Sequence, residues 1–276
     1  MNPHQAPRTS IGELFISLWR HRYLILQMTK RDVIGRYRGS VMGLAWSFFN
    51  PVLMLTIYTF VFSVIFKARW GASGGEDKAG FAIFLFVGMI VHGLFAECVN
   101  RAPSLVLSNV NYVKKVVFPL EILPSVAMGS ALFHAGISLI VLLAARFIVN
   151  QQLSWTAIFI PMIFLPLCLA TMGLAWFLSA LGVYLRDVGQ TIGIFTTALM
   201  FLSPVFYPIT ALPAEYQTWL RLNPLTFFIE ESRNVLVSGQ LPDWSVWMSF
   251  FLVSLALAWI GFWWFQKSRK GFADVL

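Results

Sequence analysis

Apolar residues gather in six long stretches along the chain, separated by shorter polar segments. A helix of roughly 20 mostly apolar residues is long enough to cross the hydrocarbon core of a bilayer. We expect six such helices, at Val41–Phe66, Phe81–Val99, Pro119–Ile148, Trp155–Tyr184, Gln190–Pro208 and Ser245–Phe265. The first stretch starts too late and runs too long for a secretory signal peptide. The pattern therefore predicts an all-α integral membrane protein with six transmembrane helices.

The composition supports this prediction and excludes several other classes of protein. Hydrophobic residues make up 58% of the 276 positions and charged residues 12%, whereas soluble domains average about 45–50% and about 25%. The net charge of +8 does not indicate nucleic-acid binding, because the basic residues flank apolar runs rather than forming one solvated face. Cys98 and Cys168 both lie in apolar stretches, where we expect reduced cysteines with a structural role.

Basic residues are distributed unequally between the two ends of the predicted helices. Cytoplasmic segments of membrane proteins carry an excess of Lys and Arg. If the N-terminus lies in the cytoplasm, 14 of the 20 basic residues fall on the cytoplasmic side, and an even number of spans returns the C-terminus to that side. We divide the chain into a cytoplasmic N-terminal segment (1–40), a membrane domain (41–265) and a cytoplasmic tail (266–276).

The N-terminal segment Ile11–Lys30 has the periodicity of an amphipathic helix. Apolar side chains recur along it at helical spacing, at Ile11, Phe15, Leu18, Trp19, Tyr23 and Leu26. Arg20, His21 and Arg22 add charge of the kind that seeks lipid headgroups. We expect a helix lying in the inner interface of the membrane, and a simple membrane anchor is the alternative.

The segment Arg31–Ser40 leads from this helix into the first span. Its three arginines could serve only to orient the protein in the membrane. Gly35 and Gly39 allow a tight bend between the interface helix and the span.

The cytoplasmic loop Asn100–Phe118 is longer than the connection that a helical hairpin needs, which is about 2–8 residues. It contains Arg101, Lys114 and Lys115. Either it is an ordinary connection, or it is an element that docks a partner protein.

The outer segment Ile209–Trp244 is too apolar for a solvated loop and predicts two short helices. Pro213 can lie in the first turn of the first helix, and Asn223 caps the second helix, which has Pro224 at its first position. Gly239 ends the second helix or the turn after it. We expect this pair to dip back into the membrane as re-entrant helices, which requires that protein or a water-filled cavity cover the backbone. The alternative is that both helices lie flat on the membrane surface.

Catalytic chemistry is not indicated by any motif in the chain. A phosphate-binding G-x-x-x-x-G-K-[ST] loop, a metal-binding H-E-x-x-H helix, a G-x-S-x-G turn and paired catalytic carboxylates are all absent from the sequence. Glu97 and Glu121 lie near span ends, so we expect boundary groups rather than buried acids.

Three other ionisable residues lie within or beside the predicted spans. Arg146 is close enough to an outer end to reach the interface. His92 and His134 fall within spans, where a neutral histidine bonded to a neighbouring helix is favoured over a proton relay, because we expect no second titratable group at comparable depth.

Aromatic residues are concentrated in the first predicted span. Sugars stack on aromatic faces, and Tyr and Trp also offer a polar group, so an aromatic pore lining for a carbohydrate would explain this bias. Candidate lining residues are Trp46, Phe49, Tyr58 and Phe60 in the first span, with Phe195 and Phe201 in the fifth. Trp46, Phe49 and Phe60 can share one helical face, and Tyr58 lies off it. Plain helix packing or lipid contact would explain the bias as well.

Two segments resemble one family of membrane proteins. Arg36–Trp46, continuing to Asn50-Pro51 and Tyr58–Phe62, is similar to the opening of ABC-2 type permeases that export polysaccharides. Leu222–Leu225 and the spacing of Glu230 and Arg233 resemble the outer-loop signature of the same family. The form of the opening segment is most similar to O-antigen exporter subunits, with capsule and teichoic-acid exporters as siblings.

The resemblance implies an architecture and partners that the composition does not reveal. It implies a homodimer of six-span subunits in the bacterial inner membrane, bound to two copies of a separate ATP-binding subunit that holds ATP and Mg, with no cofactor or metal in this chain. The substrate would be an undecaprenyl-diphosphate-linked polysaccharide moved to the periplasm, with spans one and five bordering the channel.

The resemblance also implies roles for two of the segments between spans. The loop Asn100–Phe118 would dock the ATPase, with Arg101, Lys114 and Lys115 as candidates. The helices Ala214–Leu222 and Leu225–Val237 would form a periplasmic gate, and the candidate gate residues are Pro213, Trp219, Asn223, Pro224 and Phe227.

Two rival functions remain. One is an ABC-2 permease for a drug or a small lipid. The other is an intramembrane enzyme that modifies glycolipids, which would need acids or histidines clustered at one depth.

Overall fold

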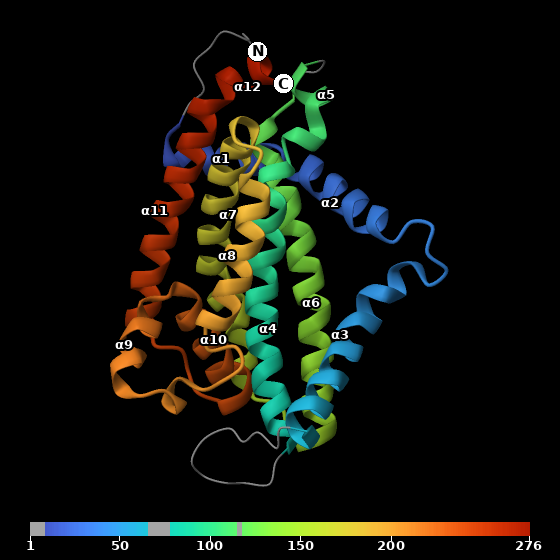
Figure 1. Cartoon of the computed structure of the whole chain (residues 1–276), viewed down its shortest axis with the longest axis vertical. Coiled ribbons are helices and arrows are strands. Elements are labelled where there is room, and N and C mark those ends of the chain that lie inside the picture. The colour runs from blue at the N-terminus through green and yellow to red at the C-terminus, as the bar shows by residue number, and fades with distance from the viewer. Residues whose placement is uncertain (1–8, 66–77, 115–117) are drawn as a thin grey trace.

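The computed structural model describes residues 9–65, 78–114 and 118–276. These residues form helices and connecting turns, without a β-strand among them (Figure 1), which confirms the all-α prediction. Five of the helical segments described are long and apolar enough to cross a membrane: Gly43–Phe62, Gly80–Ser104, Leu120–Val149, Trp155–Tyr184 and Trp244–Val275.

Four long helices form the central bundle. α4 (Lys78–Arg101) packs against α6 (Leu123–Asn150), and α7 (Ile160–Tyr184) packs against α11 (Trp244–Ser268). The α7–α11 pair is close because Gly173 and Gly261 face each other, and a Cβ at either position would collide with the backbone of the other helix. Small residues that let backbones approach are typical of helix pairs in membranes.

Two further helices lie at the periphery of the bundle. α3 (Trp46–Tyr58) continues into the π-helix η2 (Thr59–Ile65) and leans against α4 and α6. α8 (Val188–Leu202) lies against α4 and α7 and has 15 residues. At about 1.5 Å per residue it is shorter than the hydrocarbon core, which is about 30 Å thick. The fifth stretch is therefore not one full-length helix; Pro204 and Pro208 lack the backbone N–H that would extend it.

The N-terminal segment forms two helices rather than the single one expected. α1 (Ile11–Arg20) and α2 (Arg22–Arg36) are separated at His21, whose φ of −100° and ψ of 12° depart from helical values. The imidazole Nδ1 of His21 lies 2.9 Å from the carbonyl oxygen of Ser17, which helps to fix this break. Most of the predicted apolar stripe is exposed on this subunit, at Ile11, Phe15, Trp19, Tyr23 and Leu26. An exposed apolar stripe beside charged residues is consistent with an interfacial position.

The chain turns sharply between α2 and α3. Gly39 and Gly43 have φ angles of 88° and 51°, in the left-handed region that favours glycine. Gly35, also expected to take part in the bend, stays inside α2. The short 3₁₀-helix η1 (Gly43–Ala45) then leads into α3.

Short elements gather at each end of the bundle (Figure 1). One end carries the short helices η3 (Ala102–Ser104), η4 (Leu107–Asn109), α5 (Val110–Lys114), η5 (Leu120–Ile122), η9 (Arg269–Gly271) and α12 (Phe272–Val275). We call this the α12 end. The opposite end carries η6 (Trp155–Phe159), η7 (Ile209–Ala211), α9 (Ala214–Leu222), α10 (Pro224–Arg233) and the π-helix η8 (Asn234–Ser238). We call this the α9–α10 end.

Candidate functional site

The face of α8 that the subunit leaves exposed is partly polar. Gln190, Thr191 and Thr197 are exposed along it, although the rest of the helix is apolar. A shallow groove runs along this face, lined by Gln190, Gly193, Ile194, Thr197, Ala198 and Phe201. Polar side chains in a membrane segment are usually directed at protein or at a water-filled cavity. This face therefore has the character of a contact or pathway surface.

The exposed surface of α3 is aromatic and apolar. Trp46, Phe49 and Phe60 are 40%, 43% and 57% exposed, so the three members of the predicted face all point away from the subunit's core. Tyr58 is half-buried and lines a cavity between α3, α4 and α6. Trp46 donates its indole N–H to Ser40 Oγ at 3.0 Å, which ties the start of α3 to the preceding corner.

Aromatic rings connect the far ends of the first and fifth spans. Phe206 stacks on Phe62 of η2 at a centroid distance of 6.2 Å and on Phe201 of α8 at 5.4 Å. Phe195, the other candidate on α8, is half-exposed. The structure thus brings Phe201, but not the whole candidate set, into one cluster with the first span.

The α9–α10 corner is built as the sequence predicts. Asn223 caps α10 by accepting a hydrogen bond from the Leu225 N–H at 3.0 Å, and Pro224 occupies the first helical position. Asn223 also donates to Ser203 Oγ at 2.9 Å, which joins the corner to the end of α8. Gly239 ends the segment with a φ of 71°. Pro213 is the N-cap residue of α9 and so precedes the first turn.

The two helices of this corner differ in how firmly they are held. α9 has no buried residue, and Trp219 is 73% exposed. In α10, six residues are buried. Phe227 stacks on Phe250 of α11 with ring centroids 4.1 Å apart, so this candidate gate residue packs on the last span.

A buried arginine holds α10 in place. In the sequence this residue stood out only as part of the resemblance at Glu230 and Arg233. Arg233 is 2% exposed. It donates to the backbone carbonyls of Phe84 in α4 and Val205 after α8, both at 3.0 Å, and to Glu230 at 2.7 Å. Burial lowers the pKa of Arg233 to about 10, which leaves the guanidinium charged at neutral pH. The spacing of three residues between Glu230 and Arg233 was the signal in the sequence.

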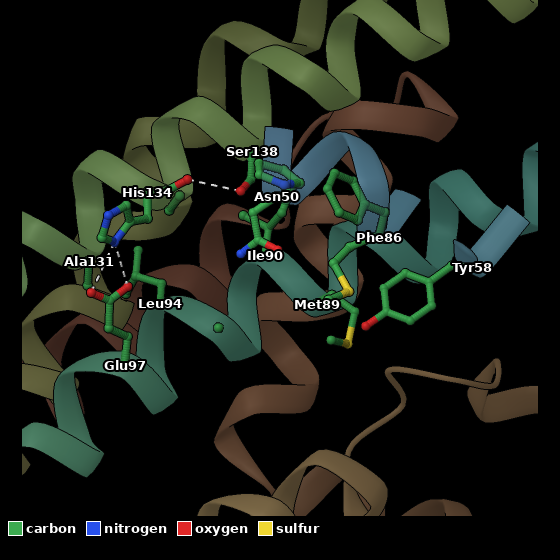
Figure 2. A pocket seen from close by; sticks show the side chains of 14 residues that line it. Asn50, Tyr58, Phe86, Met89, Ile90, Leu94, Glu97, Ala131, His134 and Ser138 are labelled. Carbon is green, nitrogen blue, oxygen red and sulfur yellow. Dashed lines mark hydrogen bonds and ion pairs between the residues drawn. The ribbon is translucent and has the colours of Figure 1, made fainter. Parts of the chain in front are cut away.

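A cavity of about 190 Å³ separates α3 from α4 and α6 (Figure 2). At one end Glu97 lies 3.0 Å from His134, and Glu97 also pairs with Arg36 at 2.6 Å. Tyr37 Oη lies 3.1 Å from the other ring nitrogen of His134. The expectation that no second titratable group lies at the depth of His134 was therefore wrong, because a helix can bring Glu97 beside it. His92 does bond to a neighbouring helix, through the Thr196 carbonyl at 3.0 Å.

Asp32 extends this network toward the α12 end. It pairs with Arg101 at 2.8 Å and accepts a hydrogen bond from Ser130 at 2.7 Å. Burial alone would raise the pKa of Asp32, but the hydrogen bonds and charges of Arg101, Ser130 and Arg36 lower it below its ordinary value. Arg101, a candidate docking residue, is thus engaged within its own chain. Lys114 is exposed, and Lys115 lies outside the described residues.

Glu121 is a buried acid and not the boundary group that was expected. It is 7% exposed and pairs with Arg269 at 2.9 Å, and its other oxygen accepts a hydrogen bond from Ser17 at 3.1 Å. Helix α1 and the C-terminal segment enclose it. Arg146 donates to Ser154 Oγ at 3.0 Å and to the Val237 carbonyl at 2.7 Å, both at the α9–α10 end.

A set of metal ligands is not formed in the part of the chain that the structure describes. Within it, no group of three or more His, Cys, Asp or Glu side chains could hold a metal ion. Cys98 is buried, Cys168 half-buried, and both are free. The arrangement offers surfaces for stacking, hydrogen bonding and helix contact.

Known proteins with similar sequences are membrane transport subunits. The chain is 27% identical over 259 residues to the O-antigen export system permease protein RfbA of Myxococcus xanthus, covering 93% of this chain and 96% of that protein. It is 25% identical to the RfbA protein of Klebsiella pneumoniae, with 92% and 95% covered. It is 21% identical to the polysialic acid transport protein KpsM of Escherichia coli, with 77% and 81% covered.

The family assignment follows from residues 23–237, which match the model of the ABC-2 type transporter family. This region runs from the start of α2 to η8 and includes the exposed faces of α3 and α8, the buried Arg233 and the α9–α10 corner. The chain belongs to the ABC-2 type transporter family and is an integral membrane permease.

Proposed function

We propose that this chain is the transmembrane subunit of an ABC exporter that moves an undecaprenyl-diphosphate-linked polysaccharide of the O-antigen type from the cytoplasm to the periplasm. Support comes from the two O-antigen export permeases, whose similarity extends over 92–93% of this chain. The opening segment Arg36–Trp46 and the corner at Asn223 and Pro224 carry the same resemblance. The protein would reside in the bacterial inner membrane with both termini in the cytoplasm.

The observation that carries the proposal is the pair of exposed faces on α3 and α8. Gln190, Thr191 and Thr197 would be poorly placed against lipid, and the face of Trp46, Phe49 and Phe60 suits stacking on sugar rings. A second copy of the chain would enclose both faces, so that spans one and five border a channel between two subunits. Each stacking contact is modest, which lets a long glycan slide without a tight binding site.

The α9–α10 corner would close the periplasmic end of this channel. Its anchored helix α10 and its exposed helix α9 suit a re-entrant gate, with Pro213, Trp219, Asn223, Pro224 and Phe227 as its candidate residues.

ATP hydrolysis would be carried out by two copies of a separate ATP-binding subunit docked at the α12 end. ATP and Mg would bind to that partner, and this chain would carry no cofactor. The sequence of this chain contains no phosphate-binding loop motif.

The direct test measures export and ATP hydrolysis together. The chain is purified alone and after co-expression with the ATP-binding protein encoded in the same gene cluster. We expect no ATP turnover by the chain alone, turnover by the complex, and accumulation of lipid-linked glycan in the cytoplasm of a deletion strain. Turnover by the lone chain, or normal surface glycan in the deletion strain, would exclude the proposal.

A capsule polymer is the second candidate substrate, because the relative from Escherichia coli is a polysialic acid transport protein. The same deletion strain distinguishes the two. Loss of lipid A-linked O-antigen supports the first substrate, and loss of capsule with intact O-antigen supports the second.

A further inference from the structure

The last eight residues of the chain fold onto the α12 end instead of trailing from it. Arg269 donates to Glu121 and to the carbonyl of Phe118, both at 2.9 Å. The side chain of Phe272 is 0% exposed and lies beside the rings of Phe265 and Tyr184, at centroid distances of 5.6 and 6.1 Å. A fully buried aromatic residue and a paired arginine hold this segment at a fixed position.

The same segment braces the loop that we propose as the ATPase docking element. α12 packs against both α5 and α7. Phe118, whose carbonyl binds Arg269, stacks on Tyr112 of the loop with ring centroids 4.3 Å apart. Tyr184 donates to the Ser268 carbonyl at 2.9 Å, which ties the end of α7 to the end of α11. The loop, α12 and the α7–α8 turn therefore form one continuous surface.

The exposed part of that surface carries both apolar and charged side chains. Leu185 in the α7–α8 turn and Val275 in α12 are 55% and 49% exposed. Exposed charged residues from four elements accompany them: Lys114 of α5, Arg186 and Asp187 of the α7–α8 turn, Lys270 of η9 and Asp274 of α12. Exposed apolar side chains on a surface that also carries charges of both signs are typical of a protein interface.

The α12 segment extends beyond the bilayer. α11 alone has 25 residues, and roughly 20 already suffice to cross the hydrocarbon core. Lys267, Arg269 and Lys270 follow where such a helix emerges. Val275 therefore lies outside the hydrocarbon core. Contact with lipid does not stabilise an exposed valine at that position.

The docking loop by itself is too small for a stable interface. Its exposed residues, in the part that the structure describes, are Asn100, Ser104, Ser108, Asn111 and Lys114. Stable interfaces involve about 20–30 residues on each side. Exposed residues that continue this surface are those of α12 and the α7–α8 turn.

We propose that the C-terminal helix α12, together with the α7–α8 turn, is part of the docking surface for the ATP-binding subunit, with Leu185 and Val275 as its apolar centre. This inference rests on the proposed function, since it requires that the partner exist. Arg269, Glu121 and Phe272 are positioning residues that hold the surface together. The partner's complementary surface would be apolar at its centre, with charged groups around it.

The test uses the complex of full-length chain and ATPase and the double variant Leu185→Asp/Val275→Asp. Leu153→Asp is the matched control, because Leu153 is 52% exposed at the opposite end of the molecule. We expect the double variant to retain less than about one tenth of the co-purified ATPase, because charges would be buried without partners at the centre of the interface. The control should retain all of it. Thermal unfolding of each purified chain shows whether the variants fold.

A cross-linking experiment covers the case in which the double variant misfolds. Val275→Cys is introduced into a chain whose Cys98 and Cys168 are replaced by alanine, and a short thiol-to-amine reagent is added to the complex. A covalent product with the ATPase is expected. Its absence, or full ATPase binding by a folded double variant, overturns the inference while the wild-type complex still supports the proposed function. A wild-type chain that binds no ATPase refutes the proposed function itself.

Discussion

Helices α4 and α3 are both apolar, but α4 is mostly buried within the subunit and α3 is mostly exposed. In the most apolar window of Gly80–Ser104, 72% of the residues are buried, against 6% in Gly43–Phe62. α4 packs on α6, α8 and α10, whereas α3 presents aromatic side chains outward. One span therefore stabilises the subunit, and the other is available for a second copy, for substrate or for lipid.

The largest expected effect is on stability. It distinguishes alanine substitutions at two phenylalanines, one in α4 and one in η2, which continues α3. Phe95 of α4 is 6% exposed, and Phe60 beside α3 is 57% exposed. Phe95→Ala leaves a cavity and should lower the free energy of unfolding by about 3–5 kcal/mol. Phe60→Ala should change it by less than about 0.5 kcal/mol. Unfolding of the purified subunit in detergent measures both, and equal losses would contradict the comparison.

The exposed helix should instead matter for transport. Ala substitutions at Trp46, Phe49 and Phe60 should reduce the surface glycan delivered per assembled complex, and the triple variant most. If all variants export normally, the aromatic face contacts lipid and not substrate.

Arg233 fastens α10 to α4, and its replacement should have the next largest effect on stability. Arg233→Leu removes the hydrogen bonds from the guanidinium to the carbonyls of Phe84 and Val205 and to Glu230. A hydrogen bond that involves a charged group contributes about 1.5–3 kcal/mol. We expect a loss of about 2–4 kcal/mol in the free energy of unfolding. Arg221→Leu, at an exposed arginine of α9, is the control and should leave stability unchanged. Equal stability of the two variants would show that Arg233 does not hold the corner.

Two glycines of α4 provide a sharper test within one helix. A Cβ at Gly88 would lie 3.1 Å from both Arg233 Nη2 and Val205 Cα, whereas a Cβ at Gly93 meets no atom within 4 Å. Gly88→Ala should therefore cost about 1–3 kcal/mol. Gly93→Ala should be neutral or slightly stabilising, because alanine favours helix more than glycine does. A thermal unfolding series measures both, and the reverse order would refute this packing.

The smallest stability effect is expected at the α9–α10 corner. Asn223→Ala removes the cap of α10 at a cost of about 0.5–2 kcal/mol, and Pro224→Gly frees the same backbone. If the corner closes the channel, the double variant should let small solutes enter liposomes that contain the complex. The wild-type complex is the control. Sealed liposomes together with full export would rule out a gate at this corner.

Much of the local structure could be predicted from the sequence, because it depends on neighbouring residues. The long apolar runs form helices that satisfy their own backbone groups, as any segment in lipid must. The end signals of these helices are local in the same way. Asn223 caps α10 through the Leu225 N–H, Pro224 fits the first helical position, and Gly239 adopts the positive φ that ends η8. The length of the fifth helix was overestimated, since hydropathy does not register that Pro204 and Pro208 stop a helix.

Contacts between distant residues could not be predicted in the same way. Glu97 and Glu121 looked like boundary groups, because their partners His134, Arg269 and Ser17 are far away in the chain. Burial of an acid is favourable only with such partners, and only the packing of helices supplies them.

The sequence by itself thus determined that the chain is helical, that it crosses the membrane and where its helices cap or bend, because hydropathy and capping are local properties. The tertiary structure decided which apolar faces are core and which stay open, and which charges meet. Hydropathy cannot distinguish these cases, since a side chain facing another helix and one facing lipid are equally apolar.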